Sequence, residues 1–244
     1  MGTLTIGSYN IQKGMGVDLR RDLDRTAGVL AEMNCDVVGL QEVLLGGEPE
    51  SGVVGRDQAD YLAARLGMTS VVGVTRPHAG GLYGNVVLTR LPVASVERRS
   101  LSFGTREPRG ALRVSVVAFG RTVHVHNCHF GLGPGERRFQ LAELRRFLGE
   151  SEGARVVMGD FNEWYSGPVS ASLWRGLASR APAAPRTHPA FYPLFALDRL
   201  YCDAELAPGE MRAHRTERSR VASDHLPVVV TVTVGEEAGA RKAS

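Results

Sequence analysis

The chain has 244 residues, of which 43% are hydrophobic and 23% are charged. This composition is typical of a folded globular protein and excludes disordered and fibrous classes. Its 29 basic and 26 acidic side chains give a net charge of +3. The arginines are scattered, whereas a dedicated nucleic-acid binder usually carries a dense basic stripe.

The three cysteines lie far apart in the sequence and indicate neither a disulfide framework nor a thiolate metal site. No apolar run approaches the roughly 18 residues of a membrane span, and the N-terminus lacks the pattern of a signal peptide. We therefore expect a cytoplasmic protein, and action at a membrane surface stays open.

The N-terminal part of the chain alternates between strand and helix patterns. A β-prone run at 4–10 is followed by an amphipathic helix at 19–33, in which apolar residues recur at helical spacing. A short apolar strand at 37–40 precedes a second helix at 59–66, which Gly67 ends.

From residue 68 the period changes to that of strands. Strands are predicted at 69–74, 83–89, 93–100, 111–118, 122–128, 155–158, 200–202, 211–213 and 228–233, with helices at 136–148 and 169–177. This order predicts one α/β domain over residues 1–234, in which two mixed sheets pack face to face with helices outside. The last ten residues, 235–244, are predicted to form a frayed tail.

Polar side chains of the types found in catalytic and metal sites stand at the ends of these strands. They are Asn10, Glu42, His129, Asp160, Asn162, Asp198, Asp224 and His225. Gathered at one edge of packed sheets, such groups make a ligand-binding cleft. Carboxylates, amides and imidazoles without thiolates favour Mg²⁺, with Mn²⁺ as a substitute, over Zn²⁺. Each residue also has a plainer explanation, such as a turn cap or a solvated strand end.

Six short motifs appear in the order found in the endonuclease/exonuclease/phosphatase superfamily. They are Ser8-Tyr9-Asn10-Ile11, Leu40-Gln41-Glu42-Val43, Asn127-Cys128-His129-Phe130, Gly159-Asp160-Phe161-Asn162, Leu197-Asp198-Arg199 and Ser223-Asp224-His225-Leu226-Pro227. Each motif is weak alone, but the ordered set is specific and spans nearly the whole chain. The sequence thus resembles a bacterial branch of this superfamily, and the resemblance implies a four-layer α/β sandwich.

The resemblance also implies roles for individual residues. The implied catalytic residues are His129, Asp160, Asn162, Asp198 and His225. The implied metal ligands are Asn10, Glu42 and Asp224. Candidates for contact with the substrate phosphate are Asn85, Arg109 and Arg137. In the deoxyribonucleases of the family a glutamate pairs with the second histidine, here His129, and Glu107 is the nearest candidate partner.

The implied activity is a divalent-metal-dependent phosphoester hydrolase, most simply a phosphodiesterase that uses in-line attack of an activated water. A nuclease, a lipid phosphodiesterase and a small-molecule phosphodiesterase all stay open. So do a phosphomonoesterase acting on phosphorylated sugars, inositols or lipid headgroups, and a non-catalytic binding module. A phosphoester substrate is the only partner implied. Aromatic residues at 161–165 and 191–195 can stack nucleobases, contact acyl chains or belong to the core.

Overall fold

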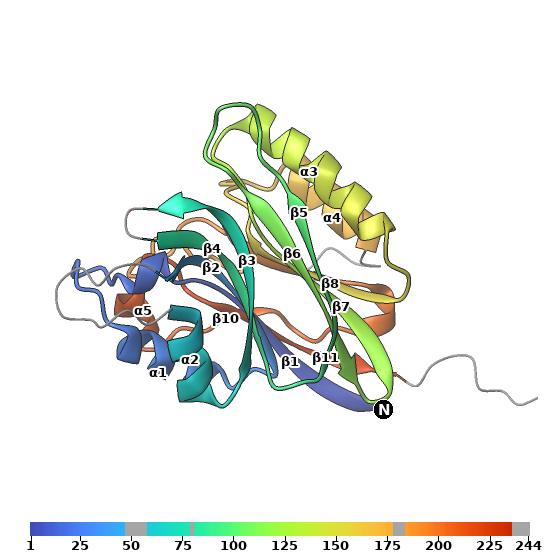
Figure 1. The fold of residues 1–244 in the computed structure, drawn as a ribbon, viewed down its shortest axis with the longest axis horizontal. Helices are drawn as coiled ribbons and strands as arrows, with labels where there is room; N and C mark the ends of the chain where they lie inside the picture. Colours follow the sequence, from blue (N-terminus) through green and yellow to red (C-terminus); the bar gives the residue numbers. More distant parts are fainter. Residues whose placement is uncertain (47–57, 79–80, 178–183, 236–244) are drawn as a thin grey trace, which may run out of the picture.

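Two β-sheets form the centre of the computed structural model, which describes residues 1–46, 58–78, 81–177 and 184–235 (Figure 1). The first sheet has six strands in the order β10-β11-β1-β2-β4-β3, and the second has five in the order β5-β6-β7-β8-β9. The strands are β1 (Gly2–Asn10), β2 (Val37–Leu45), β3 (Thr69–His78), β4 (Gly81–Thr89), β5 (Val93–Ser100), β6 (Gly110–Ala118), β7 (Arg121–His129), β8 (Ala154–Asp160), β9 (Asp198–Cys202), β10 (Arg212–Ala213) and β11 (Val228–Val234).

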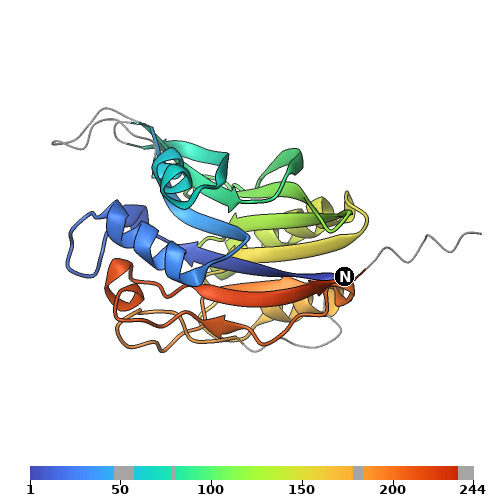
Figure 2. The same ribbon diagram turned by 90° about the horizontal axis from the view of Figure 1, so that it is seen from below.

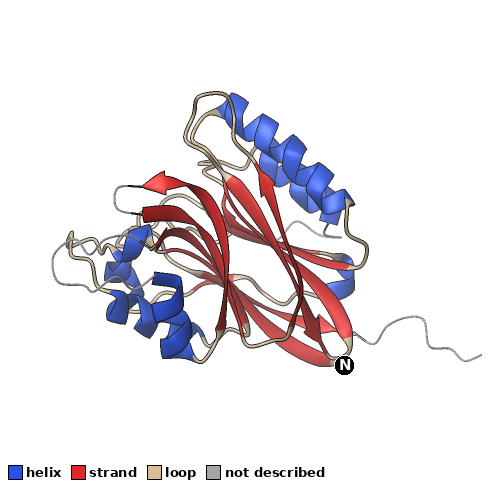
Figure 3. Ribbon diagram, viewed as in Figure 1, coloured by secondary structure: helices blue, strands red, loops and turns tan. Residues whose placement is uncertain are grey.

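Helices cover the two outer faces of this pair of sheets (Figure 3). On the first sheet lie α1 (Leu23–Met33), α2 (Gln58–Leu66) and the short α5 (Ser219–Ala222), and on the second lie α3 (Pro134–Gly149) and α4 (Pro168–Leu177). The predicted four-layer α/β sandwich is therefore confirmed. None of the helices in the described ranges has the length and apolarity needed to span a bilayer.

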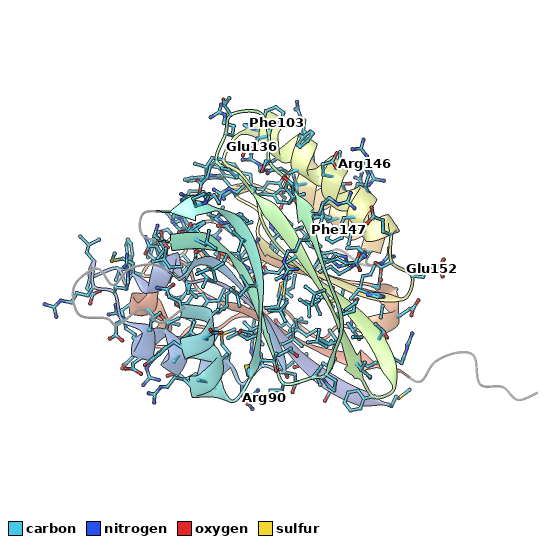
Figure 4. The ribbon with its side chains drawn as sticks, viewed as in Figure 1. Arg90, Phe103, Glu136, Arg146, Phe147 and Glu152 are labelled. Carbon is cyan, nitrogen blue, oxygen red and sulfur yellow. The ribbon has the colours of Figure 1, made fainter. Side chains whose placement is uncertain are left out.

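The main core lies between the two sheets and is built from alternate strand residues. Its members include Ile6, Val114, Val156 and Val230, all at most 3% exposed. Two further clusters fill the spaces under the helices on each outer face. On α3, the side chain of Phe147 points toward the second sheet, while that of Arg146 points outward (Figure 4). The apolar faces of strands and helices thus account for the layer order.

The first and last long strands are neighbours in the first sheet. β1 pairs with β11 in antiparallel register from Gly2 opposite Val234 to Ser8 opposite Val228. Figure 2 shows the two strands, blue and red, running side by side. On its other side β1 pairs in parallel with β2. The two ends of the described chain therefore meet in the middle of one sheet.

The first helix begins later than its apolar pattern predicts. The periodicity starts at Leu19, but α1 begins at Leu23 and Asp22 is its N-cap, because the Asp22 carboxylate accepts a hydrogen bond from the backbone N–H of Arg25. Leu19 itself has a φ of 60° and is exposed. The correction follows the capping preference of aspartate, which takes precedence over the period of leucines.

The second strand is longer than predicted and contains an irregularity. β2 continues to Leu45, and its pairing with β4 shifts register between Leu40 and Val43. Glu42 lies inside this bulge with a φ of 57°. A bulge inserts an extra residue and redirects side chains, so Glu42 need not follow the alternation of the strand. Of the predicted frayed tail, residues 236–244 lie outside the described residues.

Candidate active site

Strand ends from both sheets bring the predicted site residues to one edge. β7 and β8 are parallel and place His129 opposite Asp160, while β9 is antiparallel to β8 and places Asp198 opposite Asp160. In the first sheet, Asn10 ends β1 beside β2. Asn10 and Asp160 then meet across the sheets, with Asn10 Nδ2 3.1 Å from Asp160 Oδ2.

The carboxylate of Asp160 lies at the centre of the site. Its Oδ2 is 3.5 Å from Nε2 of His129 and 3.8 Å from Nε2 of His225, and its Oδ1 accepts a hydrogen bond from the backbone N–H of Asn162 at 2.9 Å. Asp160 is almost fully buried, and burial raises its pKa to about 6, with Asp198 adding to the rise and His225 opposing it. A carboxylate with a pKa near neutrality can exchange protons at working pH.

His225 is held by a buried carboxylate. Its Nδ1 lies 2.7 Å from Oδ2 of Asp198, which also accepts a hydrogen bond from the hydroxyl of Thr187 at 2.6 Å. Because a carboxylate only accepts, Nδ1 carries a proton and Nε2 faces Asp160. Burial lowers the pKa of His225, but the attraction of Asp198 and Asp160 outweighs burial and the pKa is raised.

His129 has a different kind of partner. Its Nδ1 lies 3.0 Å from Nη1 of Arg109, and Nη2 of Arg109 lies 3.3 Å from Oε2 of Glu107. The expected pairing of Glu107 with His129 is therefore wrong, because the guanidinium of Arg109 stands between them. Burial, reinforced by the positive charge of Arg109, lowers the pKa of His129 well below its usual value.

The predicted metal ligands fall into two groups. Nδ2 of Asn10 lies 3.4 Å from Oε1 of Glu42, and Lys13 Nζ lies 3.5 Å from Oε2 of Glu42. Asp224 instead groups with His188 and His225, whose possible ligand atoms lie within 4.8 Å of one another. The partly exposed Glu42 carboxylate thus already forms an ion pair with the ammonium group of Lys13. Its oxygen atoms are ligands that suit a hard divalent ion better than a soft one.

Asn162 turns back toward His129 because its backbone is left-handed. With a φ of 49°, it donates from Nδ2 to the backbone carbonyl of Phe130 at 2.8 Å, and the same nitrogen lies 3.2 Å from Nε2 of His129. Asparagine is one of the few residues that adopts this conformation readily. All five predicted catalytic residues are thus linked through short contacts.

The three candidate phosphate contacts have different surroundings. Arg109 is buried beside His129, at the site. Asn85 is buried on β4 and donates to the backbone carbonyl of Gly110 at 2.9 Å. Arg137 lies at the start of α3 and donates to the backbone carbonyls of Gly131 and Leu132. The last two side chains have structural hydrogen bonds that a phosphate contact would have to replace or share.

Residues beyond the predicted set complete the site. Thr187 holds Asp198, and the ring of His188 packs against that of His225 with centroids 4.8 Å apart. A backbone hydrogen bond also joins the segment of His188 to that of His225, since Ala190 N–H donates to the carbonyl of Asp224 at 2.7 Å. The Pro-rich neighbourhood of Thr187 and His188 gave no periodic signal. Only proximity in the fold connects these residues to the site.

An aromatic rim borders the site on the side of His188. We define it as Trp164, Tyr165, His188 and Phe195. The Trp164 ring lies 4.6 Å from that of Phe195 and 6.4 Å from that of His188. Trp164 is 46% exposed and Tyr165 77% exposed, whereas Phe161 is fully buried. The aromatic residues near 161–165 are therefore divided between core and surface.

The two-sheet fold, with polar residues gathered where its strands end, defines a class of protein. Residues 7–225 match the family model described as the Endonuclease/Exonuclease/phosphatase family, and the chain belongs to that family. Members of the family are typically metal-dependent phosphoester hydrolases.

Individual relatives extend the similarity over nearly the full length. The uncharacterized protein YbhP of Escherichia coli strain K12 is 32% identical over 237 residues, covering 91% of this chain and 92% of its own. An endonuclease/exonuclease/phosphatase structure from Beutenbergia cavernae is 25% identical with a TM-score of 0.78, covering 96% of this chain and 72% of that one. A mannosyl-6-phosphatase from Bacteroides thetaiotaomicron, at 18% identity and a TM-score of 0.72, covers 94% and 99% and shares the fold.

Proposed function

We propose that the protein is a divalent-metal-dependent phosphodiesterase that cleaves its substrate by in-line attack of an activated water. The observation that carries the proposal is the set of side chains around the carboxylate of Asp160. One oxygen of this buried carboxylate lies within 3.8 Å of Asn10, His129 and His225. A purely structural carboxylate does not need two imidazoles and an amide around one of its oxygens.

The proposed roles follow from the chemistry of each group. Asp160 accepts a proton from the attacking water, and Asn162 helps to hold that water and the phosphate. His225 faces the scissile phosphate, and Asp198 fixes its orientation through Nδ1. A phosphodiester resists attack because an anion must approach an anionic centre, so positioned cationic and donor groups contribute most to the rate.

Glu42 and Asn10 are the proposed first ligands of the ion, with Asp224 completing the set directly or through water. Mg²⁺ is favoured because it takes carboxylate and carbonyl oxygens and keeps several waters, and Mn²⁺ can substitute for it. When bound, such an ion neutralises phosphate charge and makes nearby water more acidic.

The aromatic rim supports a substituted phosphodiester as the substrate class. Exposed rings beside a phosphate site can contact a base, an aryl group or an acyl chain attached to the phosphate. A small sugar phosphate offers only the C–H face of its ring to them. The second candidate is a phosphomonoesterase, since the mannosyl-6-phosphatase shares the fold.

Hydrolysis of bis-p-nitrophenyl phosphate and p-nitrophenyl phosphate, each with Mg²⁺, Mn²⁺ or chelator, tests the proposal. We expect metal-dependent cleavage of the diester, lowered about 10²–10³-fold in both Glu42→Ala and His225→Ala because each removes a group that stabilises charge. Glu210→Ala, which alters an exposed residue on the surface, serves as control. Plasmid DNA, an abasic duplex, phospholipids and inositol phosphates then define the natural class.

Undiminished activity in chelator, or in both variants, would contradict the metal-hydrolase proposal. Preference for the monoester would favour the second candidate. Retention of configuration at a chiral phosphorus substrate would exclude direct attack by water.

A further inference from the structure

We propose that Arg109 is a positioning residue that fixes His129 in the neutral tautomer with its proton on Nε2. His129 then donates a hydrogen bond to a phosphate oxygen and does not protonate the leaving group. This inference rests on the proposed function, because it chooses between two roles open to the second histidine of a phosphoester hydrolase. It departs from the carboxylate–histidine pairing that the resemblance implied.

The donors and acceptors in the contact between Arg109 and His129 determine the tautomer of His129. Arg109 Nη1 lies 3.0 Å from Nδ1 of His129. A guanidinium has only N–H donors, so the hydrogen bond exists only if Nδ1 is an acceptor. A neutral imidazole carries one N–H, and that proton must then be on Nε2.

Nε2 of His129 has one acceptor and one donor as neighbours. Oδ2 of Asp160 lies 3.5 Å away and is an acceptor. Nδ2 of Asn162 is closer, at 3.2 Å, and this amide nitrogen has two N–H groups, one of which donates to the carbonyl of Phe130 at 2.8 Å. Both ring nitrogens therefore face a donor, and a neutral imidazole can accept at only one of them. The shorter contact, from the charged guanidinium of Arg109, decides for Nδ1, so Nε2 keeps the proton and directs it toward Asp160.

A chain of charges holds Arg109 in this position. Glu107 accepts from Arg109 through Oε2 and from Arg76 through Oε1 at 3.0 Å. The backbone carbonyl of Arg109 is also fixed, since Leu101 N–H donates to it at 2.8 Å. Arg109 is only 8% exposed. A buried guanidinium on Nδ1 disfavours a second imidazole proton, because an Nδ1–H would face another donor and a like charge.

Imidazole ¹⁵N spectroscopy tests the assignment without relying on activity. In protein labelled with ¹⁵N-histidine, we expect His129 Nε2 to have the shift of a protonated nitrogen and Nδ1 that of an unprotonated acceptor. The His129 signals are those that disappear in His129→Gln. Arg109→Ala should mix the two tautomers, while Arg109→Lys keeps a donor and should preserve the Nε2–H form. Arg145→Ala, which changes an exposed arginine on α3, is the control with an unchanged spectrum.

Two substitutions of His129 test the donor in the reaction. Glutamine places an amide nitrogen near the position of Nε2, and asparagine places one near Nδ1. We expect His129→Gln to keep activity within about tenfold and His129→Asn to lose about 10²–10³-fold, the usual cost of a charge-stabilising donor.

An Nδ1–H tautomer in the wild type, a doubly protonated ring at neutral pH, or a spectrum unaltered in Arg109→Ala would overturn the inference. Equal activity loss in His129→Gln and His129→Asn would overturn the donor role. A wild type without phosphoesterase activity would instead overturn the proposed function, and the tautomer measurement would still decide the role of Arg109.

Discussion

His126 is a buried titratable residue that packs against helix α3 and does not belong to the site. It lies on β7, fully buried, with its ring edge-on to Phe147 at 5.4 Å between centroids. Burial, with the charge of Arg113 as a second cause, lowers the pKa of His126 to about 3. The folded protein therefore holds this imidazole neutral at pH values where an unfolded chain would protonate it.

We expect His126 to make the protein sensitive to acid. Because the unfolded state takes up the proton first, stability is complete above pH ~6.5 and falls as the pH drops toward 3, by at most on the order of 5 kcal/mol. Urea unfolding of His126→Leu from pH 7 to pH 4 checks this. The stability of the variant relative to wild type should rise as the pH falls. His214→Gln, which changes a histidine near the surface, should follow the wild type, and parallel curves for all three proteins would contradict the prediction.

At the scale of the residue, several site positions could be predicted because their chemistry needs a particular side chain. Asn10, Asp160, Asp198 and His225 were predicted, and the fold brings them within contact of one another through strand pairing. Their roles stay predictions. The partner of His129 could not be read from the sequence, because Glu107 and Arg109 are two residues apart and only the path of the backbone decides which one faces the ring.

At the scale of the element, strand β8 delivers Asp160 through a glycine. Gly159 has a φ of +147°, and a Cβ built on it would lie 1.8 Å from the backbone oxygen of Cys128 on β7. The two strands can approach at this point only because no side chain stands between them. The position of Asp160 therefore depends on its neighbour in sequence.

We expect Gly159→Ala to destabilise the protein by more than about 3 kcal/mol, because it adds a clash with backbone to a strained φ. Gly153→Ala is the matched control. Gly153 also has a positive φ, of +102°, but nothing lies within 4 Å of its Cβ position, so only the backbone strain of roughly 1–2 kcal/mol applies. Denaturant unfolding of both variants measures the difference, and equal losses would show that the close approach of the strands is unimportant.

Element boundaries show where sequence patterns fail. The apolar period predicted most elements to within a few residues, since strands and helices bury faces of period 2 and 3.6. The bulge at Glu42 was not predictable, because a bulge is a property of two paired strands and not of one segment. Thr187 was missed for a related reason: its stretch acquires its shape from contacts with residues 224–226.

At the scale of the whole molecule, a buried hydrogen-bond network joins the two sheets. Nδ2 of Asn127, on β7, donates to the backbone carbonyls of Leu40 and Val86 at 2.9 Å each, and its Oδ1 accepts from Gln41 at 2.7 Å. The two carbonyls are those of register partners beside the bulge, where the ladder between β2 and β4 is interrupted. One asparagine thus donates to both carbonyls beside the bulge.

We expect Asn127→Ala to cost roughly 3 kcal/mol or more, because buried carbonyls lose their donor and desolvation is no longer offset. Ser95→Ala, which removes a partly buried hydroxyl contact within one sheet, should cost less than about 1 kcal/mol. Urea unfolding at neutral pH compares the two. A loss in Asn127→Ala no larger than in Ser95→Ala would show that the network does not contribute to holding the sheets together.

Because β1 pairs with β11, the first sheet cannot be completed until nearly the whole chain has been synthesised. Asn10 leaves the ribosome long before His225, yet the two belong to one site, and β1 lacks its β11 neighbour until the final long strand is made. An unfinished chain therefore holds a strand with an unsatisfied edge and lacks part of the proposed site. On the proposed function, the chain can be active only after this last segment has been synthesised and has paired with β1.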